Sequence, residues 1–312
     1  MVNNMNPENM SVLNPVESES NTRSVAWTKI EPVLQNLQSV TGGYSDAHRG
    51  LLTLAGGKSI FVKLGVTELT KKWANKEIRA YDFLARHNYP YAPLLLSANE
   101  DNTAFALEAL KSEDGWDWSD TWSEQRLRAT LEALDTLAHI QSAPEDAELL
   151  KPAFSNAGNG WAELLLSEEL RSSLTTKLQS TAHPTLAREI ETYAERTSEF
   201  TFRHDALVHD DVRADNCPWN EKTGELKLVD WNFLELGDRR IDLSAMLVHI
   251  QNSGFDVLPN FADRLDADAL RWVAGYWLAQ GSKPIWPGGH EELRGMQLQS
   301  GLTAIRLAKE IG

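Results

Sequence analysis

Residues 208–216 read VHDDVRADN, and residues 228–231 read LVDW. Asp211 supplies a carboxylate and Asn216, five residues later, an amide, so a loop that turns back can aim both side chains into one pocket. Asp230 ends an apolar run that predicts a short strand. Mg²⁺ takes carboxylate and amide oxygens as ligands, and a further carboxylate can accept the proton of a hydroxyl group. These residue types, in this order, meet the requirements of phosphoryl transfer, where metal ions neutralise charge on the phosphate oxygens.

The same two stretches resemble a known family. The order His-x-Asp-x-x-x-x-Asn, then an apolar strand that ends in Asp, is similar to that of the aminoglycoside phosphotransferases and choline kinases, and is related to the catalytic loop of protein kinases. The resemblance extends over nearly the whole chain from about residue 35. It implies an α+β, two-lobed protein-kinase-like fold, with a small β-rich N-terminal lobe and a larger α-helical C-terminal lobe. It also implies a small-molecule kinase that uses Mg²⁺ and either ATP or GTP.

The resemblance assigns roles to individual residues. Asp211 would be the catalytic base, Asn216 and Asp230 would bind Mg²⁺, and His209 would brace the loop. Arg213 stands where protein kinases commonly carry a phosphate-contacting Lys. It either neutralises the γ-phosphate or forms a structural salt bridge, and the sequence leaves both interpretations open.

Two positions depart from the family pattern. Asp210 replaces the usual Gly before the catalytic Asp, and Trp231 replaces the usual Phe after the metal-binding Asp. Neither change removes a group that the chemistry requires. Further on, Gly237 and Asp242-Leu243 resemble the Gly-x-x-x-x-Asp-Leu stretch of the family, and we expect Asp242 to brace the catalytic loop.

In the N-terminal part, Lys63 and Glu77 are expected to form a pair. Lys63 ends the run 60–62, whose alternation can point the Lys inward, and Glu77 lies in the next predicted helix. Such a pair positions the Lys on the α- and β-phosphates of a nucleotide. Either residue alone is typical of a solvated surface charge, but together, upstream of the catalytic loop, they favour a functional pair.

A glycine-containing loop precedes the first predicted strand. Residues 41–46 read TGGYSD, and Gly42, Gly43 and Ser45 could cover phosphates through backbone N–H groups. The loop lacks the pattern G-x-G-x-x-G, and a plain turn explains it equally well.

The chain divides into three segments. Residues 1–24 are polar, without the basic start or apolar run of a signal peptide, and predict a disordered leader. Residues 25–110 would form the nucleotide-binding lobe, and residues 111–312 the catalytic and substrate lobe. By position, the segment from Glu108 to Leu110 would be the hinge, with backbone groups that face the nucleotide base.

Local patterns predict the individual elements. Gly56 and Gly57 separate two short β-type runs, which indicates a hairpin, and Ser123 can cap a helix with a regular apolar stripe. The expected strands are 51–54, 59–64, 103–107, 206–208 and 226–229. The expected helices are 70–87, one capped by Ser123, one that starts near Pro184, and 239–251, 264–280 and 290–311.

Composition narrows the range of partners. Acidic residues outnumber basic ones by 45 to 30, and the net charge of −15 disfavours nucleic-acid binding. No stretch of about 18 or more uncharged apolar residues exists, which argues against a membrane span. Cys217 is the single cysteine, so neither an intramolecular disulfide nor a cysteine-based zinc site can form. We expect a cytoplasmic enzyme without nucleic-acid or membrane partners, and the oligomeric state stays open.

The expected acceptor is a small molecule with a hydroxyl group, bound between the catalytic loop and the helices after residue 240. Carboxylates can pair with an amine, and tryptophan faces attract ammonium groups. The sequence therefore favours a cationic or neutral acceptor such as an amino sugar or amino alcohol, although solvated helix faces and core packing explain most of these residues individually. The residues considered are Asp256, Asp263, Asp266, Asp268, Glu291, Glu292, Trp116, Trp118, Trp122, Trp272, Trp277 and Trp286.

Two other functions remain open at this point. The doublets His204-Asp205 and His209-Asp210 faintly suggest a metal-dependent phosphohydrolase, but the β-like run between them disfavours its helical framework. A catalytically inactive kinase-like nucleotide-binding module is the second alternative. Such modules usually lack the Lys, the base or a metal ligand, and this sequence has all of them.

Overall fold

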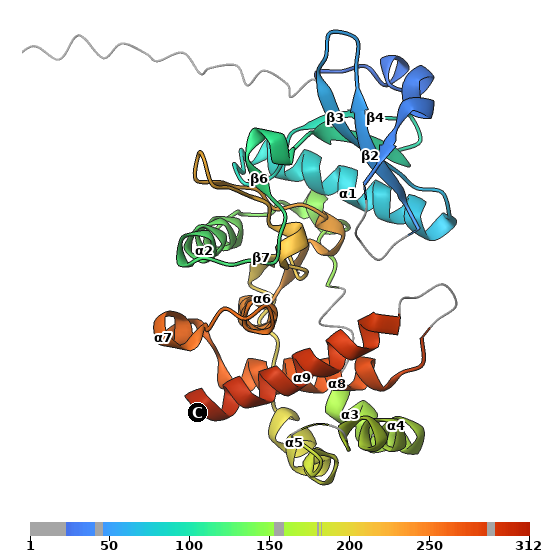
Figure 1. The fold of residues 1–312 in the computed structure, drawn as a ribbon. Coiled ribbons are helices and arrows are strands. Elements are labelled where there is room, and N and C mark those ends of the chain that lie inside the picture. Colours follow the sequence, from blue (N-terminus) through green and yellow to red (C-terminus); the bar gives the residue numbers. More distant parts are fainter. Residues whose placement is uncertain (1–22, 41–45, 153–158, 180, 182, 286–290) are drawn as a thin grey trace, which may run out of the picture.

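The computed structural model describes residues 23–40, 46–152, 159–179, 181, 183–285 and 291–312. Figure 1 shows two lobes: a sheet with helix α1 packed against it and, beyond it, a mainly helical lobe that ends with α9. The predicted glycine-containing loop, with Gly42, Gly43 and Ser45, lies outside the described residues.

A five-stranded antiparallel sheet forms the N-terminal lobe, in the order β1-β2-β3-β5-β4. The hairpin between β2 and β3 turns at Gly56 and Gly57, which have φ angles of 94° and 82° that glycine adopts without steric cost. The predicted hairpin is confirmed, with β2 beginning at His48 rather than at residue 51. The strands are β1 (Gln38–Ser39), β2 (His48–Thr53), β3 (Ser59–Leu64), β4 (Leu95–Ala98) and β5 (Ala104–Glu108).

Helix α1 (Glu68–Arg86) crosses beside this sheet and begins with a reciprocal cap. The Thr67 hydroxyl accepts a hydrogen bond from the N–H of Thr70 at 3.2 Å, and the Thr70 hydroxyl accepts one from the N–H of Thr67 at 2.9 Å. Ile78 and Tyr81 bury the inner face of the helix. Glu77 lies four residues before Tyr81, on the same face of the helix, so this face also carries the predicted partner of Lys63 into the interior.

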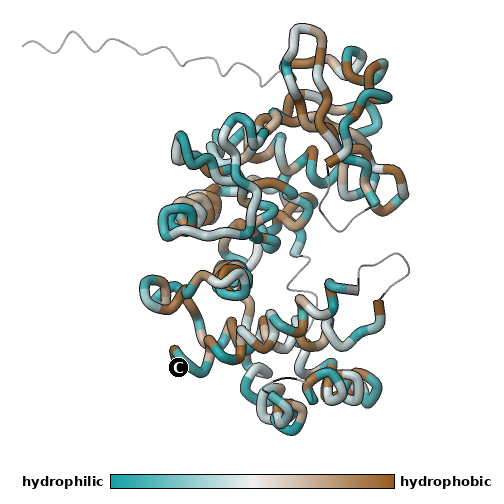
Figure 2. Tube along the Cα trace, in the orientation of Figure 1, coloured by the Kyte–Doolittle hydropathy of each residue, from teal (hydrophilic) through white to brown (hydrophobic). Residues whose placement is uncertain are grey.

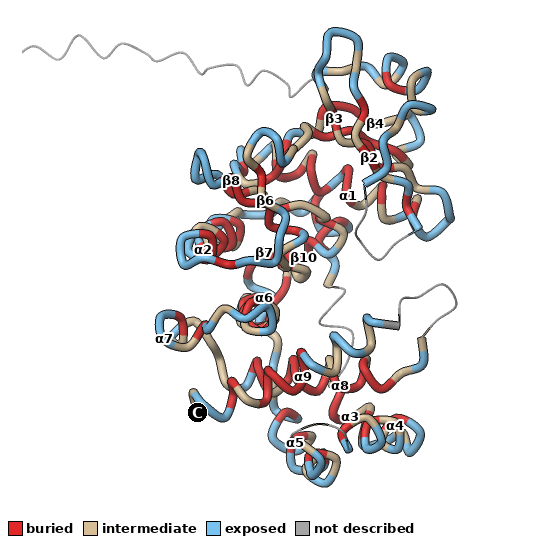
Figure 3. The backbone as a smooth tube through the Cα atoms, viewed as in Figure 1, coloured by how far each residue is buried: buried red, intermediate tan, exposed pale blue. Residues whose placement is uncertain are grey.

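Helices build the C-terminal lobe, and α8 and α9 pair along most of their length (Figure 1). Apolar residues concentrate where the helices meet, and the same positions are buried (Figures 2 and 3). No helix among the described residues is both long and apolar enough to cross a membrane. The helices are α2 (Glu124–Ala138), α3 (Gly160–Leu166), α4 (Glu168–Leu178), α5 (Ile190–Thr197), α6 (Arg239–Asn252), α7 (Leu258–Phe261), α8 (Ala267–Ser282) and α9 (Glu291–Ile311).

Short strands hold the irregular segments that lie between the helices. β7 pairs with β10, and β8 lies between β6 and β9. The catalytic-loop sequence leaves β7 directly, so the β7–β10 pair sets its starting point. The strands are β6 (Trp116–Asp117), β7 (Ala206–Val208), β8 (Trp219–Asn220), β9 (Glu225–Leu226) and β10 (Glu235–Gly237).

One predicted strand is largely wrong. Of residues 226–229, only Leu226 belongs to a strand, at the end of β9. The N–H of Val229 instead donates to the carbonyl of Asn216 at 3.0 Å. Leu226 and Leu228 are buried, but the N–H groups after Leu226 bond to separate segments, among them Tyr91 and the catalytic loop, rather than to a neighbouring strand.

The helix expected from near Pro184 also differs. Residues Leu186–Arg188 form a 3₁₀ turn, and the α-helix starts at Ile190. Strand β4 and helices α3 and α4 were not predicted. Helix α3 packs tightly on α8. At their contact, a Cβ atom on Gly160 would lie only 2.1 Å from the carbonyl oxygen of Gly275, which leaves no room for a side chain.

Candidate active site

His209 connects the start of the catalytic loop to the segment that carries Asp230. Its ring is buried, its Nε2 lies 3.0 Å from the carbonyl oxygen of Val229, and its Nδ1 accepts the N–H of Asp211 at 3.3 Å. Burial lowers the pKa of His209 to about 4, so the ring is neutral near pH 7. These contacts define the tautomer, with the proton on Nε2, and give His209 the position of a brace.

Asp211 sits among three polar groups of its own loop. The amide nitrogen of Asn216 donates to Asp211 Oδ2 at 3.0 Å and to its carbonyl oxygen at 2.8 Å. Arg213 Nε lies 3.0 Å from Asp211 Oδ1, and its guanidinium also reaches Asp215 at 3.3 Å. Burial raises the pKa of Asp211 to about 7, although Arg213 opposes the shift. The Asp211–Arg213 ion pair is thus present, and it places Arg213 beside the predicted base.

Lys63 joins two carboxylates that come from different parts of the chain. Its Nζ lies 2.6 Å from Glu77 Oε2 on α1 and 3.0 Å from Asp230 Oδ1. Lys63 and Glu77 are 7% and 2% exposed, so the pair is shielded from water. Although burial lowers the pKa of Lys63, the charges of Glu77 and Asp230 outweigh it, and the net shift is upward. The two side chains that the sequence pairs are therefore in contact, and Lys63 stays charged.

Asp230 has the left-handed backbone conformation, with a φ of 63°. That conformation turns its carboxylate towards Lys63, and Asn232 donates to the same Oδ1 atom at 2.6 Å. Burial raises the pKa of Asp230, but the Lys63 charge and hydrogen bond outweigh burial and hold the pKa below its usual value. Asp230 is therefore ionised, as a metal ligand must be.

The donor set fits Mg²⁺. Because the amide nitrogen of Asn216 is committed to Asp211, its oxygen is the atom left to face a ligand. Asp230 adds an ionised carboxylate in the same region, close enough to Asp211 to raise the pKa of that group. Two protein oxygens suit Mg²⁺, which usually keeps several waters and takes further oxygens from phosphates.

In the predicted hinge, Glu108 and Leu110 already form hydrogen bonds with other residues of the protein. The carbonyl oxygen of Leu110 accepts the indole N–H of Trp118 at 2.9 Å. The Glu108 carboxylate accepts the N–H of Leu94 at 3.1 Å and lies 3.9 Å from Lys227 Nζ. Both hinge residues thus lie between the lobes, at the end of β5 and just after it.

Asp242 contacts the catalytic loop, as the sequence suggests. Its Oδ1 accepts the N–H of Asp210 at 3.0 Å. Asp238, four residues earlier, caps α6 by accepting the N–H of Arg240 at 2.9 Å. The Gly-x-x-x-x-Asp-Leu stretch therefore starts α6 and fixes the loop at the same time.

Arg126 is a supporting residue that the sequence did not reveal. It is buried on α2, and its guanidinium donates to the carbonyls of Ala214 at 3.1 Å and Cys217 at 2.9 Å. It also stacks over Trp122 at 4.5 Å. The Arg precedes the apolar stripe of α2 and looks like an ordinary surface residue, since its carbonyl partners are distant in sequence. Its bonds hold the loop segment that carries Asn216.

Part of the expected acceptor region is engaged by the protein itself, whereas Asp256, Asp263 and Glu292 are exposed. Asp266 caps α8 by accepting the N–H groups of Asp268 and Ala269, and Asp268 pairs with Arg271 at 2.7 Å. Trp116, Trp122 and Trp272 are buried, Trp118 is exposed, and Trp286 and the side chain of Glu291 lie outside the described residues.

Two aromatic residues of α8 differ from the rest of this region. Asp211 contributes to a raised pKa of Tyr276, about 12, after the larger effect of burial, so Tyr276 lies near the predicted base. The indole nitrogen of Trp277 is buried without a hydrogen-bond partner among the described residues. Tyr276 is thus a candidate to line an acceptor site, and the ring of Trp277 packs edge-on against it at 4.9 Å.

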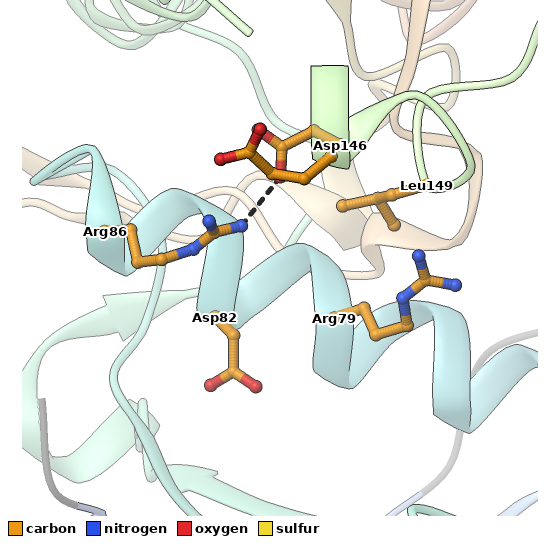
Figure 4. A pocket seen from close by; sticks show the side chains of 6 residues that line it. Arg79, Asp82, Arg86, Asp146 and Leu149 are labelled. Atoms are coloured by element: carbon orange, nitrogen blue, oxygen red, sulfur yellow. Dashed lines mark hydrogen bonds and ion pairs between the residues drawn. The ribbon is translucent and has the colours of Figure 1, made fainter. Parts of the chain in front are cut away.

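A hollow lies between helix α1 and the segment that follows α2. It encloses about 370 Å³, and its lining includes Arg79, Asp82 and Arg86 from one helix face (Figure 4). Across it, Arg86 donates to the buried carboxylate of Asp146 at 2.8 Å. This contact ties the outer face of α1 to the segment that follows α2.

Comparison with known proteins gives one family and one fold. The model of the phosphotransferase enzyme family matches residues 36–279. A search of curated proteins finds no match. Among solved structures, the aminoglycoside phosphotransferase APH(2'')-IIa, in its ternary complex with streptomycin and ATP, has a TM-score of 0.51 at 16% identity, over 88% of this chain and 94% of that chain.

Two further solved structures are similar. The choline kinase LicA of Streptococcus pneumoniae has a TM-score of 0.50 at 13% identity, over 91% of this chain and 98% of its own. An ethanolamine kinase of Plasmodium vivax has a TM-score of 0.52 at 14% identity, over 89% and 83%. The likeness confirms the predicted two-lobed, kinase-like fold of the α+β class.

Proposed function

The chain belongs to the phosphotransferase enzyme family, as the catalytic-loop sequence predicted, and we propose that it transfers the γ-phosphate of ATP or GTP to a hydroxyl group of a small molecule. The observation that carries this proposal is the meeting of charged groups from both lobes. Lys63 of the N-terminal lobe, which is paired with Glu77, reaches Asp230 of the C-terminal lobe, and Asp230 lies near Asp211.

The nucleotide and its metal ion would be bound by Lys63, Asn216 and Asp230. Lys63 stays charged beside two carboxylates, as a contact for the α- and β-phosphates requires. Asn216 and Asp230 would hold Mg²⁺, which neutralises charge on the phosphate oxygens when bound. Glu77 holds Lys63 in place and removes the freedom of its long side chain.

Asp211 would accept the proton of the acceptor hydroxyl group. The acceptor oxygen forms a bond to the γ-phosphorus, the bond from that phosphorus to the β–γ bridging oxygen breaks, and the nucleoside diphosphate leaves. The hydroxyl proton passes to a carboxylate oxygen of Asp211, whose raised pKa suits a proton acceptor near neutral pH. Arg213 fixes the Asp211 carboxylate and adds positive charge where the γ-phosphate would arrive.

We further propose a cationic or neutral acceptor, such as an amino sugar or amino alcohol. The net charge of −15 opposes an anionic acceptor. Tyr276 of α8 offers an aromatic face near the base, and such faces attract ammonium groups. Streptomycin, choline and ethanolamine, which appear in the names of the similar structures, set the starting range of acceptors.

The direct test is a screen of hydroxyl compounds for acceptor-dependent release of ADP or GDP in the presence of Mg²⁺. The panel contains aminoglycosides, amino alcohols, neutral sugars and sugar acids, and Asp211→Asn is the matched inactive control. We expect release above the rate in water for at least one amine-containing or neutral acceptor. A strongly anionic acceptor, or a polypeptide Ser or Thr, would overturn the acceptor class alone.

The same screen distinguishes phosphotransfer from the two alternative functions, a phosphohydrolase and an inactive nucleotide-binding module. A phosphohydrolase would pass phosphate to water at the same rate whatever compound is added. An inactive module would bind nucleotide and Mg²⁺, visible as a thermal shift, without turnover in any mixture. Either outcome contradicts the proposed phosphotransfer.

A further inference from the structure

The buried charge of Arg126 is balanced mainly by backbone carbonyl groups. The residue is 1% exposed, and the carboxylate of Asp117 lies 3.8 Å from Nη1, beyond hydrogen-bonding distance. Nη1 and Nη2 instead donate to four carbonyl oxygens at 2.7–3.1 Å. A buried charge is costly unless it is hydrogen-bonded, so these four bonds determine where the guanidinium lies.

The two terminal nitrogens of Arg126 bind two different segments of the chain. Nη1 donates to the carbonyls of Ser119 at 2.8 Å and Thr121 at 2.7 Å, in the segment between β6 and α2. Nη2 donates to the carbonyls of Ala214 at 3.1 Å and Cys217 at 2.9 Å, in the catalytic loop. A guanidinium carries its donors in a rigid planar fork, which allows one side chain to hold both segments at once.

The segment that Nη1 binds is also fixed by other contacts. β6, directly before it, pairs with β8. Within it, the indole N–H of Trp118 donates to the carbonyl of Leu110 in the predicted hinge. After it, the Ser123 hydroxyl caps α2 by accepting the N–H of Arg126 at 3.1 Å. Arg126 is therefore anchored on this side, through its backbone as well as its side chain.

The segment that Nη2 binds is the turn that carries Asn216. Ala214–Asn216 form a 3₁₀ turn, and the N–H of Cys217 closes this turn on the carbonyl of Ala214 at 3.2 Å. Nη2 binds the carbonyls on both sides of Asn216, so the residue lies between two fixed points. The amide nitrogen of Asn216 donates to Asp211, which leaves the amide oxygen for a metal ion.

We propose that Arg126 is a positioning residue for Asn216, and that it sets the amide oxygen of Asn216 where Mg²⁺ would bind. The inference rests on the proposed function, because it takes Asn216 as a metal ligand. Arg126 acts through the backbone of the turn, and the ring of Trp122, at 4.5 Å, supports its guanidinium. Residues that orient metal ligands typically change metal affinity or activity by about tenfold to a hundredfold.

A purely structural role for Arg126 leads to a different result. In that case, replacement of Arg126 lowers the free energy of unfolding, but the protein that stays folded responds to Mg²⁺ as the wild type does. The positioning role requires the folded protein itself to respond less to Mg²⁺. The Mg²⁺ response of folded variants therefore separates the two roles.

The test is a Mg²⁺ titration of nucleotide binding, made on variants that circular dichroism shows to be folded. Arg126→Lys keeps the charge but loses the planar fork, so we expect its midpoint at about tenfold higher Mg²⁺. Nucleotide binding without Mg²⁺ should stay within about twofold of the wild type, since the change acts on a metal ligand. Arg128→Lys, on the same helix with a side chain 60% exposed, is the matched control and should leave both unchanged. An unshifted midpoint in folded Arg126→Lys would overturn the proposal.

A double-mutant cycle tests whether Arg126 acts through Asn216. Asn216→Ala removes the oxygen that Arg126 would position. Addition of Arg126→Lys to this variant should therefore shift the Mg²⁺ midpoint by less than about twofold. Shifts that multiply would show that Arg126 affects the metal by another route, and this result would contradict the proposal.

A change at Trp122 provides a test that keeps Arg126. Trp122→Leu removes the ring beside the guanidinium and should shift the Mg²⁺ midpoint in the same direction by a smaller factor. If Arg126→Lys does not fold, an unshifted midpoint in Trp122→Leu overturns the proposal. A wild type whose nucleotide binding does not respond to Mg²⁺ would contradict the proposed function itself. A normal wild-type response that Arg126→Lys leaves unchanged contradicts this inference alone.

Discussion

The two faces of helix α1 use charged side chains in opposite ways. On the inner face, Glu77 pairs with Lys63, and the side chains are 2% and 9% exposed. On the outer face, Asp82 pairs with Arg23 at 3.0 Å, and these side chains are 48% and 36% exposed. Both are pairs of one acid and one base at hydrogen-bonding distance. Figure 3 shows that α1 carries both buried and exposed positions along its length.

The difference in burial decides what each pair can do. An exposed pair gains about 0–1 kcal/mol, because water solvates both charges as well as the partner does. A buried pair stabilises the fold little in net terms, but removal of one partner leaves an uncompensated charge and costs roughly 3–5 kcal/mol. The inner pair is therefore suited to hold a charge in a fixed place for a ligand, and the outer pair is not. The predictions below test this contrast, from the largest effect to the smallest.

Asp211→Asn should lower turnover by on the order of a hundredfold or more, with nucleotide binding nearly normal. The amide keeps the shape of the carboxylate and one oxygen acceptor for the contacts within the loop, but it cannot take a proton. Steady-state kinetics with a confirmed acceptor, together with nucleotide titration, measure both quantities. Asp215→Asn, an exposed acid of the same loop, is the matched control. Near-normal turnover in folded Asp211→Asn would exclude Asp211 as the base.

Asp230→Asn and Asn216→Ala should each weaken the response to Mg²⁺ by about tenfold or more, since each removes an oxygen ligand or its charge. Asp230→Asn is preferred to Ala because the amide oxygen can still accept a bond from Lys63. A Mg²⁺ titration of nucleotide binding gives the midpoints, with Asn260→Ala, an exposed residue, as the control. Unshifted midpoints in both variants would refute the metal assignment.

A pair of double-mutant cycles compares the two faces of α1 directly. Lys63→Ala should raise the nucleotide KM or lower kcat, and Glu77→Ala should act in the same direction. Because the two residues act as one unit, the double mutant should be much less impaired than the product of the single effects, with a coupling of about 1–3 kcal/mol. The Arg23/Asp82 cycle, measured on stability, should couple by about 0–1 kcal/mol. Equal couplings would remove the distinction between buried and exposed pairs.

Local patterns predicted the elements that local chemistry determines. Gly56 and Gly57 fix the hairpin through their positive φ angles, and Ser123 caps α2 where expected. The spacing of Asp211, Asn216 and Asp230 indicated the reaction type because each residue type has a specific task. The sequence predicted these features without any knowledge of distant contacts.

The remaining features depend on contacts between distant segments. Residues 227–229 look like a strand, but their N–H groups bond to segments distant in sequence or to the catalytic loop, and not to a neighbouring strand. Arg126 resembles a surface residue until its carbonyl partners, far along the chain, are known. Asp210 was interpreted as a tolerated replacement of glycine, and its N–H donates to the carboxylate of Asp242 on α6, a contact between distant segments. No local pattern indicates which acids will be buried together.

The smallest effects are expected at the contact between Arg86 and Asp146 beside the outer hollow (Figure 4). The Asp146 side chain is 4% exposed and that of Arg86 is 54% exposed, so the two partners should differ. Asp146→Ala also frees the N–H of Ala143, which the carboxylate accepts at 3.2 Å, and should lower the free energy of unfolding by about 1–2 kcal/mol. Arg86→Ala should lower it by about 0.5 kcal/mol, no more than Arg79→Ala, which lines the same hollow.

At acid pH, the difference in the free energy of unfolding between the wild type and Asp146→Ala should disappear. Burial raises the pKa of Asp146, but the bonds from Arg86 and the Ala143 N–H outweigh burial, so the net shift is downward. A lowered pKa contributes stability above the unfolded-state value, near 4, and this contribution is lost as pH falls through the folded-state value. Urea unfolding of the wild type and Asp146→Ala at neutral and strongly acidic pH should therefore converge at the acidic end. Turnover should stay within about twofold of the wild type in all three variants. If Arg86→Ala impaired turnover as severely as Lys63→Ala, the outer face of α1 would have to be coupled to the nucleotide site, and burial alone would no longer separate the two faces.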